Sequence, residues 1–546
     1  MDSMTTMTAG TAGTTETTET TASPRWIPEM TDHSVLDRPD LSLPALRQRY
    51  LSGELQPEQL VRALHARAQA EDALHHRHAW ITRLSLDQML AHARALAGRD
   101  PASLPQYGIP FAIKDNIDLA GVPTTAGCPD FAYTPERSAT VVERLMAAGA
   151  IPVGKTNLDQ FATGLVGVRS PYGACRNSID PAYVSGGSSS GSAVTVALGL
   201  ASFSLGTDTA GSGRVPAMFN NLIGLKASCG RIPTTGVVPA CRTLDVVSVF
   251  ALTAGDAAAV LAVAQGPDAG DAYSRTFAAA GHAFSASSTA GGFRFGVPRD
   301  EDLEFHGNAD GPGQLAAAVA HLVALGGTPV TVDLRPFREV ARLLYEGPWV
   351  AERYQAIRRF IEASPQSLHP VTRAITLAGA AISAPDTFAA LYRLRELQQR
   401  TQAVWDGIDC MVTPTASTHY TIAAVEADPI RLNANLGHYT NHVNLLDLAA
   451  VAVPTGRQRV PAGQPAATPD DQAAASDHAL PWGVSLVAPA GQDLPLLQLA
   501  ARLHARAVAV VGATGHAPHR RASAAPDAAA FATCEVLPAV CGAGQR

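Results

Sequence analysis

The spacing of apolar side chains predicts helices near the start of the chain. From Leu43 to about Arg99, apolar residues recur at intervals of three and four, as in residues 57–64, which is the period of an amphipathic helix. Residues 1–24 consist largely of Thr, Ala, Gly and Ser with few large apolar side chains, so burial cannot offset the entropy lost on ordering. We therefore expect a disordered tail over 1–24, then helices over 25–99 that form a cap or a dimer arm.

From about residue 100 onward, helical and extended patterns alternate. Residues 151–154 have the composition of a strand, while 192–200 reads as a helix rich in Ala and Val. Such alternation predicts an α/β fold in which helices cover a sheet. We expect a core over 100–512 within one large domain, 25–512.

The second half of the chain continues this alternation. It predicts a helix over 314–325, a strand over 328–332, a long helical stretch over 337–362 with a break at Gly347 and Pro348, an exposed insertion over 456–479 and a last helix over 495–510. Residues 513–546 are rich in Ala, Pro and His, which indicates a loose tail.

Composition narrows the class of protein. The 546 residues are 46% hydrophobic and 16% charged, and the net charge of -7 gives no broad attraction to nucleic acid or to an anionic membrane. No apolar run is long enough to span a bilayer, and the first residues lack the features of a secretory signal. Seven cysteines form no C-x-x-C pair, and no H-E-x-x-H pattern occurs. We expect a cytoplasmic protein without a metal, a nucleic-acid partner or a membrane partner.

Two glycine-rich loops carry the candidate chemistry. Three serines, Ser188, Ser189 and Ser190, lie between glycines that allow close backbone approach, and Ser212 lies between Gly211 and Gly213. A flexible Gly/Ser linker is the alternative for the first loop, although its flanks are apolar and structured. A phosphate-binding loop would need a Gly-Lys-Ser/Thr sequence, which is absent there. An isolated serine in a glycine turn, as in the second loop, is usually only a turn residue.

Lys114, upstream in Gly-Ile-Pro-Phe-Ala-Ile-Lys-Asp-Asn, makes the pattern specific. A lysine followed by Gly-Gly-Ser-Ser at 186–189 and Gly-Thr-Asp-Thr-Ala-Gly-Ser at 206–212 resembles the amidase signature family of serine hydrolases, over roughly 43–512. The resemblance implies a large mixed β-sheet covered by helices on both faces, with a catalytic core over 100–512. It also implies that neither a metal nor an organic cofactor is needed.

The resemblance also assigns roles to residues. Ser212 resembles the acylated nucleophile, Ser188 the bridging serine held by a cis peptide bond, and Lys114 the base. The N–H groups of Thr209, Ala210, Gly211 and Ser212 correspond to the oxyanion hole.

The lysine can act as a base only in its neutral form. An ordinary lysine, with a pKa of about 10.4, is protonated at neutral pH, so burial beside Phe111 and Ile113 would have to lower the pKa of Lys114. Asp208 and Arg214 flank Ser212, and we interpret them as an ion pair that braces the loop rather than as catalytic charges.

Other segments narrow the resemblance to the allophanate hydrolases. Residues 157–173, 231–242 and 344–354 are similar to theirs, and Tyr345 and Arg353 match the pair that contacts the substrate carboxylate. Spaced by eight, the two side chains could share one helix face if Pro348 does not redirect the helix. A surface arginine in an ordinary salt bridge is the alternative.

The resemblance implies hydrolysis of allophanate (urea-1-carboxylate) with release of ammonia, by a homodimer. A broader amidase, an inactive binding module and a tRNA-dependent amidotransferase chain of the A type remain alternatives. Many allophanate hydrolases continue into a C-terminal domain linked to decarboxylation of the first product. We expect no full domain of that kind in 513–546.

Overall fold

The structure, a computed structural model, describes residues 40–277, 292–459 and 479–514, all within one compact unit. In these ranges the strands form one eleven-stranded sheet in the order β1-β3-β2-β4-β6-β5-β10-β11-β9-β7-β8. The strands are β1 (Trp80–Arg83), β2 (Pro110–Lys114), β3 (Ile151–Thr156), β4 (Phe203–Asp208), β5 (Ile223–Lys226), β6 (Val246–Ala251), β7 (Phe293–Pro298), β8 (Gly327–Val332), β9 (Cys410–Pro414), β10 (Leu448–Arg459) and β11 (Ala479–Pro489).

The sheet is mixed. β2 pairs in parallel with β3 and β4, and β7 pairs in parallel with β8 and β9, whereas the remaining neighbours are antiparallel. The central strands are buried along their whole length, as expected for a sheet covered on both faces. The predicted large mixed sheet is therefore confirmed.

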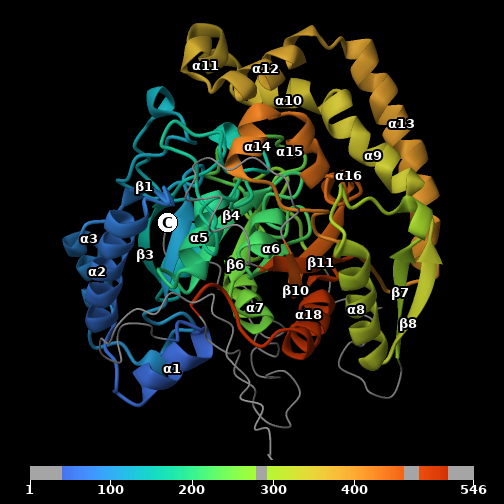
Figure 1. The fold of residues 1–546 in the computed structure, drawn as a ribbon. Coiled ribbons are helices and arrows are strands. Elements are labelled where there is room, and N and C mark those ends of the chain that lie inside the picture. The colour runs from blue at the N-terminus through green and yellow to red at the C-terminus, as the bar shows by residue number, and fades with distance from the viewer. Residues whose placement is uncertain (1–39, 278–291, 460–478, 515–546) are drawn as a thin grey trace, which may run out of the picture. The chain divides into compact units, whose positions relative to one another are not determined.

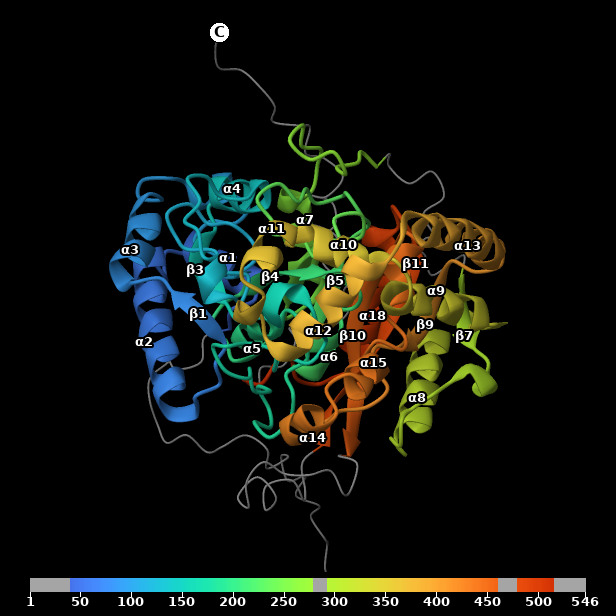
Figure 2. The same ribbon diagram turned by 90° about the horizontal axis from the view of Figure 1, so that it is seen from above.

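Helices cover both faces of this sheet. Seen from above, α4 and α7 lie on one side of the central strands, and α5 and α6 lie on the other (Figure 2). The helices are α1 (Leu43–Leu51), α2 (Pro57–His75), α3 (Leu86–Arg94), α4 (Thr140–Ala147), α5 (Ser190–Ala197), α6 (Val215–Phe219), α7 (Ala254–Ala264), α8 (Gly311–Ala324), α9 (Arg335–Glu346), α10 (Trp349–Ala356), α11 (Arg358–Ala363), α12 (Pro370–Ala378), α13 (Ala384–Gln402), α14 (Ile422–Ala427), α15 (Arg431–Leu436), α16 (His442–Leu445) and α18 (Asp493–Ala507).

The N-terminal segment differs from the expectation of helices alone. Its three helices, α1 to α3, form as predicted, but β1 lies between α2 and α3 and pairs antiparallel with β3 (Figure 1). The sequence Trp-Ile-Thr-Arg is rich in aromatic and β-branched side chains, which favour a strand. This segment therefore adds an edge strand to the sheet beside the three predicted helices.

Most of the helices and strands predicted for the second half of the chain form near their predicted positions. The helical stretch breaks at Gly347 and Pro348, where α9 ends and α10 begins, and α8, β8 and α18 form close to their predicted positions. The expected insertion is shorter than predicted, because β10 continues to Arg459 and β11 starts at Ala479. Residues 460–478, the predicted tail over 1–24 and most of 513–546 lie outside the described residues.

A helix that crosses a bilayer must be both long and apolar. No single described helix has both the length and the apolar character needed to do so. Two consecutive helical segments, Pro370–Ala381 and Ala384–Asp406, together meet the criteria of length and composition, although they are bent by 99° relative to each other.

Candidate active site

Lys114 lies at the end of β2, between β3 and β4, and its side chain is fully buried. Its Nζ is 2.7 Å from Ser188 Oγ and 2.7 Å from Thr207 Oγ1. The β-sheet thus brings together a lysine and two hydroxyl residues that lie 74 and 93 positions apart in the sequence.

Burial strongly perturbs this lysine. Loss of solvent lowers the pKa of Lys114 from 10.5 to about 7, because the ammonium form loses its hydration. The negative charges of Asp159, Asp245 and Asp208 oppose the decrease, and the positive charge of Arg353 adds to it. The neutral amine, which is the form that can accept a proton, is therefore populated at neutral pH.

The first glycine loop places Ser188 against this amine. The Gly187–Ser188 peptide bond is cis. A Cβ atom on Gly187 would lie 2.1 Å from Asp159 Oδ2, so only glycine allows this approach of the two segments. The backbone N–H of Asp159 in turn donates to the carbonyl of Ser188, at 3.1 Å. The loop is therefore held against the Asp159 segment by close packing and by a backbone hydrogen bond.

The second loop connects β4 to α6 and carries Ser212, which is 2% exposed. Behind it, Arg214 Nε lies 2.9 Å from Asp208 Oδ2 in an ion pair whose side chains are fully buried. Burial alone would raise the pKa of Asp208, but the Arg214 guanidinium more than compensates and the pKa falls below its ordinary value. The predicted brace for this loop is thus confirmed by geometry.

Of the four predicted oxyanion-hole groups, one is already engaged. The N–H of Gly211 donates to Asp208 Oδ1 at 2.8 Å, so it does not point freely into the site. Among the described residues, the N–H groups of Ala210 and Ser212 have no acceptor. The expectation for Gly211 is therefore corrected, because the carboxylate that braces the loop also occupies this donor.

Ser188 and Ser212 are not in hydrogen-bond contact in the structure. In the described part of the chain, no hydrogen bond joins Ser188 and Ser212, whereas Lys114 and Ser188 are in contact. A proton relay through all three residues needs the Ser212 hydroxyl to approach Ser188.

Tyr345 and Arg353 meet, although not on one helix. Tyr345 lies in the last turn of α9 and Arg353 in α10, because Gly347 and Pro348 separate the two helices. The condition for a shared helix face is therefore not met, since Pro348 cannot continue the hydrogen bonds of α9 and redirects the chain. The redirected chain still places the Arg353 guanidinium 5.5 Å from the centre of the Tyr345 ring.

Arg353 is buried, with 3% exposure, and is not the surface arginine of the alternative interpretation. Its Nη1 donates to Ala162 O at 3.3 Å and to Thr163 Oγ1 at 3.2 Å. Its Nε is buried without a hydrogen-bond partner, and no carboxylate of the described residues lies within ion-pair distance. One edge of the guanidinium is therefore available to a ligand.

A chain of contacts connects Arg353 to the Ser212 loop. Asp245 accepts hydrogen bonds from the Thr209 hydroxyl and from the N–H of Cys241. The thiol of Cys241 in turn donates to the carbonyl of Trp349, the first residue of α10, at 3.5 Å.

Sequence reasoning missed two residues that contact this site. Thr207 holds the Lys114 amine and also accepts from Asn116 Nδ2 at 3.3 Å, and Thr163 holds Arg353. Thr207 lies inside the recognised Gly-Thr-Asp sequence, which could have pointed to it, whereas nothing in the sequence singles out Thr163.

The other candidate side chains give no second site. Within the described ranges, no three His, Cys, Asp or Glu residues are placed to hold a metal ion. Burial raises the pKa of Cys175 to about 12, so its thiol stays protonated and unreactive at neutral pH. Cys175 is therefore a packed side chain rather than a second nucleophile.

Comparison with known proteins places the chain in a family. The family model described as Amidase matches residues 59–497. Urea amidolyase of Saccharomyces cerevisiae is 43% identical over 429 residues, which cover 78% of this chain and 22% of that protein. The chain thus spans about a fifth of the length of the urea amidolyases that it matches.

Two further relatives cover more of their own length. The A chain of the glutamyl-tRNA(Gln) amidotransferase of Symbiobacterium thermophilum is 36% identical, with 76% of this chain and 90% of that protein covered. The solved structure of Kluyveromyces lactis allophanate hydrolase superposes with a TM-score of 0.77 at 38% identity, covering 85% of this chain and 72% of that one. The chain therefore belongs to the amidase family.

Proposed function

We propose that this protein hydrolyses the terminal amide of allophanate and releases ammonia. The observation that carries the proposal is the buried Arg353 guanidinium, which has a free edge and no carboxylate partner among the described residues. Asp245 and Glu352 act on the Arg353 charge without contacting it and hold its pKa above the ordinary value. A substrate carboxylate in direct contact would stabilise the buried guanidinium further. A planar guanidinium can bind such a carboxylate through two parallel hydrogen bonds.

The similarity to solved allophanate hydrolase supports the same substrate. Allophanate carries one carboxylate and one terminal amide. Arg353 would bind the carboxylate, while the amide reaches the serine loops. The charge of Arg353 acts on the pKa of Lys114, which places the two groups within one electrostatic environment. Tyr345 packs on the guanidinium face and limits its freedom to turn.

The proposed reaction uses Lys114, Ser188 and Ser212 in sequence. Neutral Lys114 accepts the proton of Ser188, which in turn accepts the proton of Ser212 as that oxygen attacks the amide carbonyl carbon. This step requires the two serine hydroxyls to come together when substrate is bound. The tetrahedral oxyanion is stabilised by the N–H groups of Ala210 and Ser212, together with that of Thr209.

The products follow from atom balance. The proton returns through Ser188 to the amide nitrogen, the C–N bond breaks, and ammonia leaves. Water then attacks the serine ester by the same proton route in reverse. Allophanate and water thus yield ammonia and N-carboxycarbamate, and Ser212 regains its proton. No metal or organic cofactor enters these steps.

The test is ammonia release by the purified protein from four compounds: allophanate, malonamate, propionamide and glutamine. We expect allophanate and malonamate, which carry a carboxylate close to the amide, to be preferred strongly over propionamide. Ser212→Ala should lower turnover by at least about a thousandfold, as loss of a serine nucleophile does. Ser190→Ala is the matched control, because the Ser190 hydroxyl donates to Asn157 O at 3.3 Å and does not contact Lys114. Wild-type turnover by Ser212→Ala would remove the proposed nucleophile.

The similarity to the amidotransferase supplies a second candidate function. A chain of that kind would prefer glutamine and would depend on partner chains for its full reaction. Rapid hydrolysis of glutamine with no action on allophanate would favour this candidate over ours.

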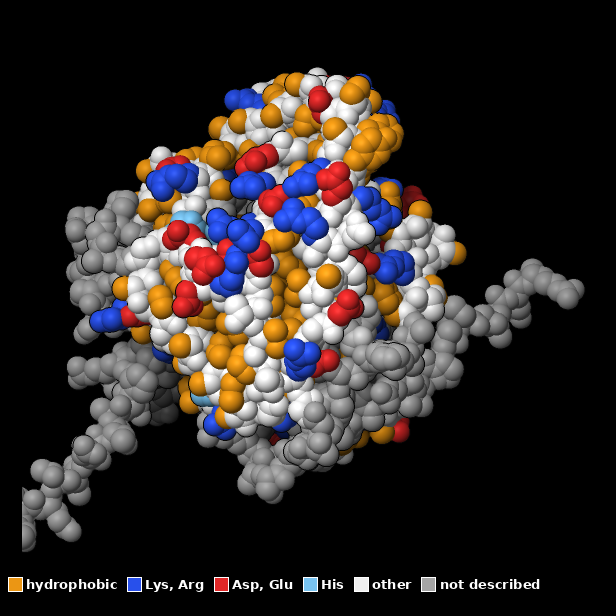
Figure 3. Space-filling model, turned by 90° about the vertical axis from the view of Figure 1, so that its right-hand side faces the viewer, with side chains coloured by type: hydrophobic (Ala, Val, Ile, Leu, Met, Phe, Trp, Pro, Cys, Tyr) orange, Lys and Arg blue, Asp and Glu red, His pale blue; other side chains and the backbone are white. Residues whose placement is uncertain are grey.

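We also propose that the protein is a cytoplasmic homodimer. The described cysteines are free thiols, which suits a reducing compartment. Helix α13 exposes three large apolar side chains that could serve self-association, Phe388, Leu391 and Tyr392, which are between 41% and 67% exposed. Figure 3 shows hydrophobic side chains gathered at the upper end of the face on which α13 lies. Light scattering of the wild type and of Tyr392→Asp tests this assembly, because a charge in the interface should yield monomers.

A further inference from the structure

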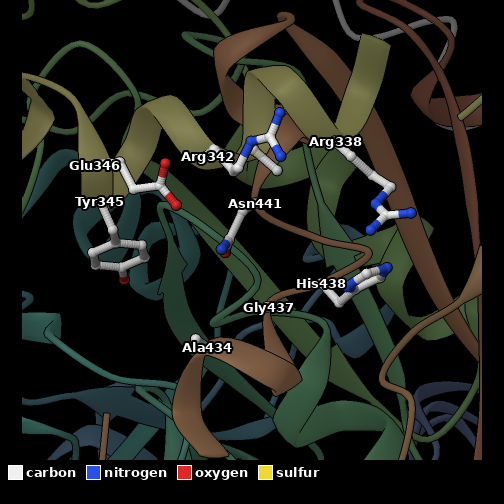
Figure 4. Close-up of a pocket in the computed structure, with 9 residues that line it drawn as sticks. Arg338, Arg342, Tyr345, Glu346, Ala434, Gly437, His438 and Asn441 are labelled. Carbon is white, nitrogen blue, oxygen red and sulfur yellow. The ribbon is translucent and has the colours of Figure 1, made fainter. Parts of the chain in front are cut away.

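A cavity of about 260 Å³ lies beside the proposed carboxylate site, between α9 and the turn that joins α15 to α16. Figure 4 shows Arg338, Arg342, Tyr345 and Glu346 entering it from α9, while Ala434, Gly437, His438 and Asn441 face them from the turn and its flanks. Arg338 is half-buried and Arg342 is exposed, so the cavity has a solvent-facing mouth.

The cavity holds positive charge that the protein does not neutralise. Within the described residues, neither Arg338 nor Arg342 forms an ion pair or a side-chain hydrogen bond. Two other charges of the same helix are paired: Arg335 binds Asp333, and Glu339 binds Arg393 and Arg400. The unpaired arginines, one turn apart, therefore share the cavity with a single carboxylate, that of Glu346.

Unsatisfied polar atoms add to the case for a ligand. Asn441 is 8% exposed, and its buried Oδ1 has no hydrogen-bond partner. The buried Nε2 of His438 also lacks a partner. Burial and the nearby charge of Arg338 lower the pKa of His438 to about 4, so the ring is neutral at pH 7 and can donate one hydrogen bond. Buried polar atoms in a native fold are normally satisfied, so both atoms are open to a hydrogen bond from water or from a solute in the cavity.

The walls of this cavity touch both parts of the proposed active site. Tyr345 lines the cavity and packs on Arg353. Thr440, next to Asn441, accepts a hydrogen bond from Arg214 through its carbonyl, and a Cβ atom on Gly211 would lie only 2.4 Å from its hydroxyl. The cavity thus adjoins the Arg353 side and the Ser212 side of a site whose own residues are almost fully buried.

We propose that this cavity is an antechamber that captures a small carboxylate and directs it to Arg353 and Ser212. The inference rests on the proposed function and adds where the anionic substrate first binds. Arg338 and Arg342 attract the anion from solution, while the Asn441 amide and the His438 ring hydrogen-bond to it. Such local capture suits a protein whose overall charge of -7 repels anions.

The first test compares kcat/KM for allophanate at several salt concentrations. In the wild type, kcat/KM should fall as salt screens the arginines. The double variant Arg338→Gln/Arg342→Gln should have kcat/KM about tenfold lower at low salt, with a much weaker salt dependence and with kcat kept. The matched control is Arg359→Gln, which removes one exposed arginine of α11 that lies outside the cavity.

Replacement of Glu346 should change kcat/KM in the opposite direction. Glu346→Gln removes the one carboxylate of the cavity, so it should raise kcat/KM for allophanate at low salt and leave propionamide hydrolysis as it was. A lower kcat/KM in this variant, or a salt dependence in the double variant equal to that of the wild type, would overturn the antechamber.

A binding experiment separates this proposal from the proposed function. Malonate, a small dicarboxylate, is titrated into two proteins by isothermal calorimetry. The first is Ser212→Ala, and the second carries Arg338→Gln and Arg342→Gln in addition. We expect affinity to fall at least about fivefold without the arginines. If the enzyme fails to hydrolyse allophanate, the proposed function fails, yet weaker malonate binding would still support an anion site here. Equal malonate affinity in both proteins would overturn the site whichever substrate the enzyme uses.

Discussion

The buried Lys114 should reduce the stability of this fold at neutral pH, and its replacement should reveal by how much. A decrease of its pKa from 10.5 to about 7 corresponds to about 5 kcal/mol of cost for burying the charged form. Lys114→Met removes that cost while keeping an apolar side chain of similar length. It also leaves the Ser188 and Thr207 hydroxyls without the amine, which costs about 1–3 kcal/mol. We therefore expect an inactive variant that is more stable than the wild type by about 2–4 kcal/mol at pH 7.

The pH dependence gives the sharper result. Between the folded pKa of about 7 and the unfolded value of 10.5, the unfolded chain binds more protons at Lys114 than the folded protein does. Wild-type stability must then rise with pH relative to Lys114→Met, by about 1.4 kcal/mol for each pH unit. Below pH 7 both states are protonated, so the full cost remains and the two curves run parallel.

The assay is urea unfolding of both proteins at pH 6, 7, 8 and 9, followed by fluorescence. From pH 7 to pH 9 the stability advantage of Lys114→Met should shrink by roughly 2–3 kcal/mol. The acid limb of kcat/KM for the wild type should show the same pKa of about 7, with activity rising as the amine loses its proton. A stability difference that stays constant from pH 7 to pH 9 would refute the reasoning, because it would mean that Lys114 titrates alike in both states.

Three further predictions concern the surroundings of the site. Arg353→Lys should raise KM for allophanate by about ten- to a hundredfold, because that factor corresponds to the loss of a charge-assisted hydrogen bond. Propionamide hydrolysis should change little, and equal losses for both substrates in steady-state assays would contradict the carboxylate role. Asp208→Asn should destabilise the fold by about 3–5 kcal/mol in urea unfolding, since it leaves the buried Arg214 unpaired, and a loss below about 1 kcal/mol would speak against the brace. Thr207→Val should move the acid limb of kcat/KM to lower pH by up to about one unit, because the ammonium form of Lys114 loses an acceptor, and an upward shift in the pH profile would contradict this.

Much of the fold could be predicted from local patterns. The alternation of helices and strands after residue 100 predicted the covered sheet, and Gly347 with Pro348 predicted the break between α9 and α10. The strand β1 was missed because four residues between two amphipathic helices carry little periodic signal. Its partner β3 lies about 70 residues later, and pairing at that distance cannot be inferred from local composition.

The candidate site was predictable only where a motif carried it. Lys114, Ser188 and Ser212 stand in recognisable segments, and the structure places the first two in contact. The donor from Gly211 to Asp208 and the contact from Thr163 to Arg353 depend on how the loops turn in space. Local residue types do not encode those turns. The prediction for the oxyanion hole therefore included the N–H group of Gly211, which the structure engages with Asp208.

The account depends most on Ser212 as the residue that becomes acylated by allophanate. The measurement is a single turnover with allophanate carrying carbon-14 in its amide carbonyl, quenched in acid within one turnover time and followed by peptide mapping. We predict label on the peptide that contains Ser212, absent from Ser212→Ala and much reduced in Lys114→Met. Label on another peptide, or ammonia release at the wild-type rate with no labelled peptide at any quench time, would contradict the account.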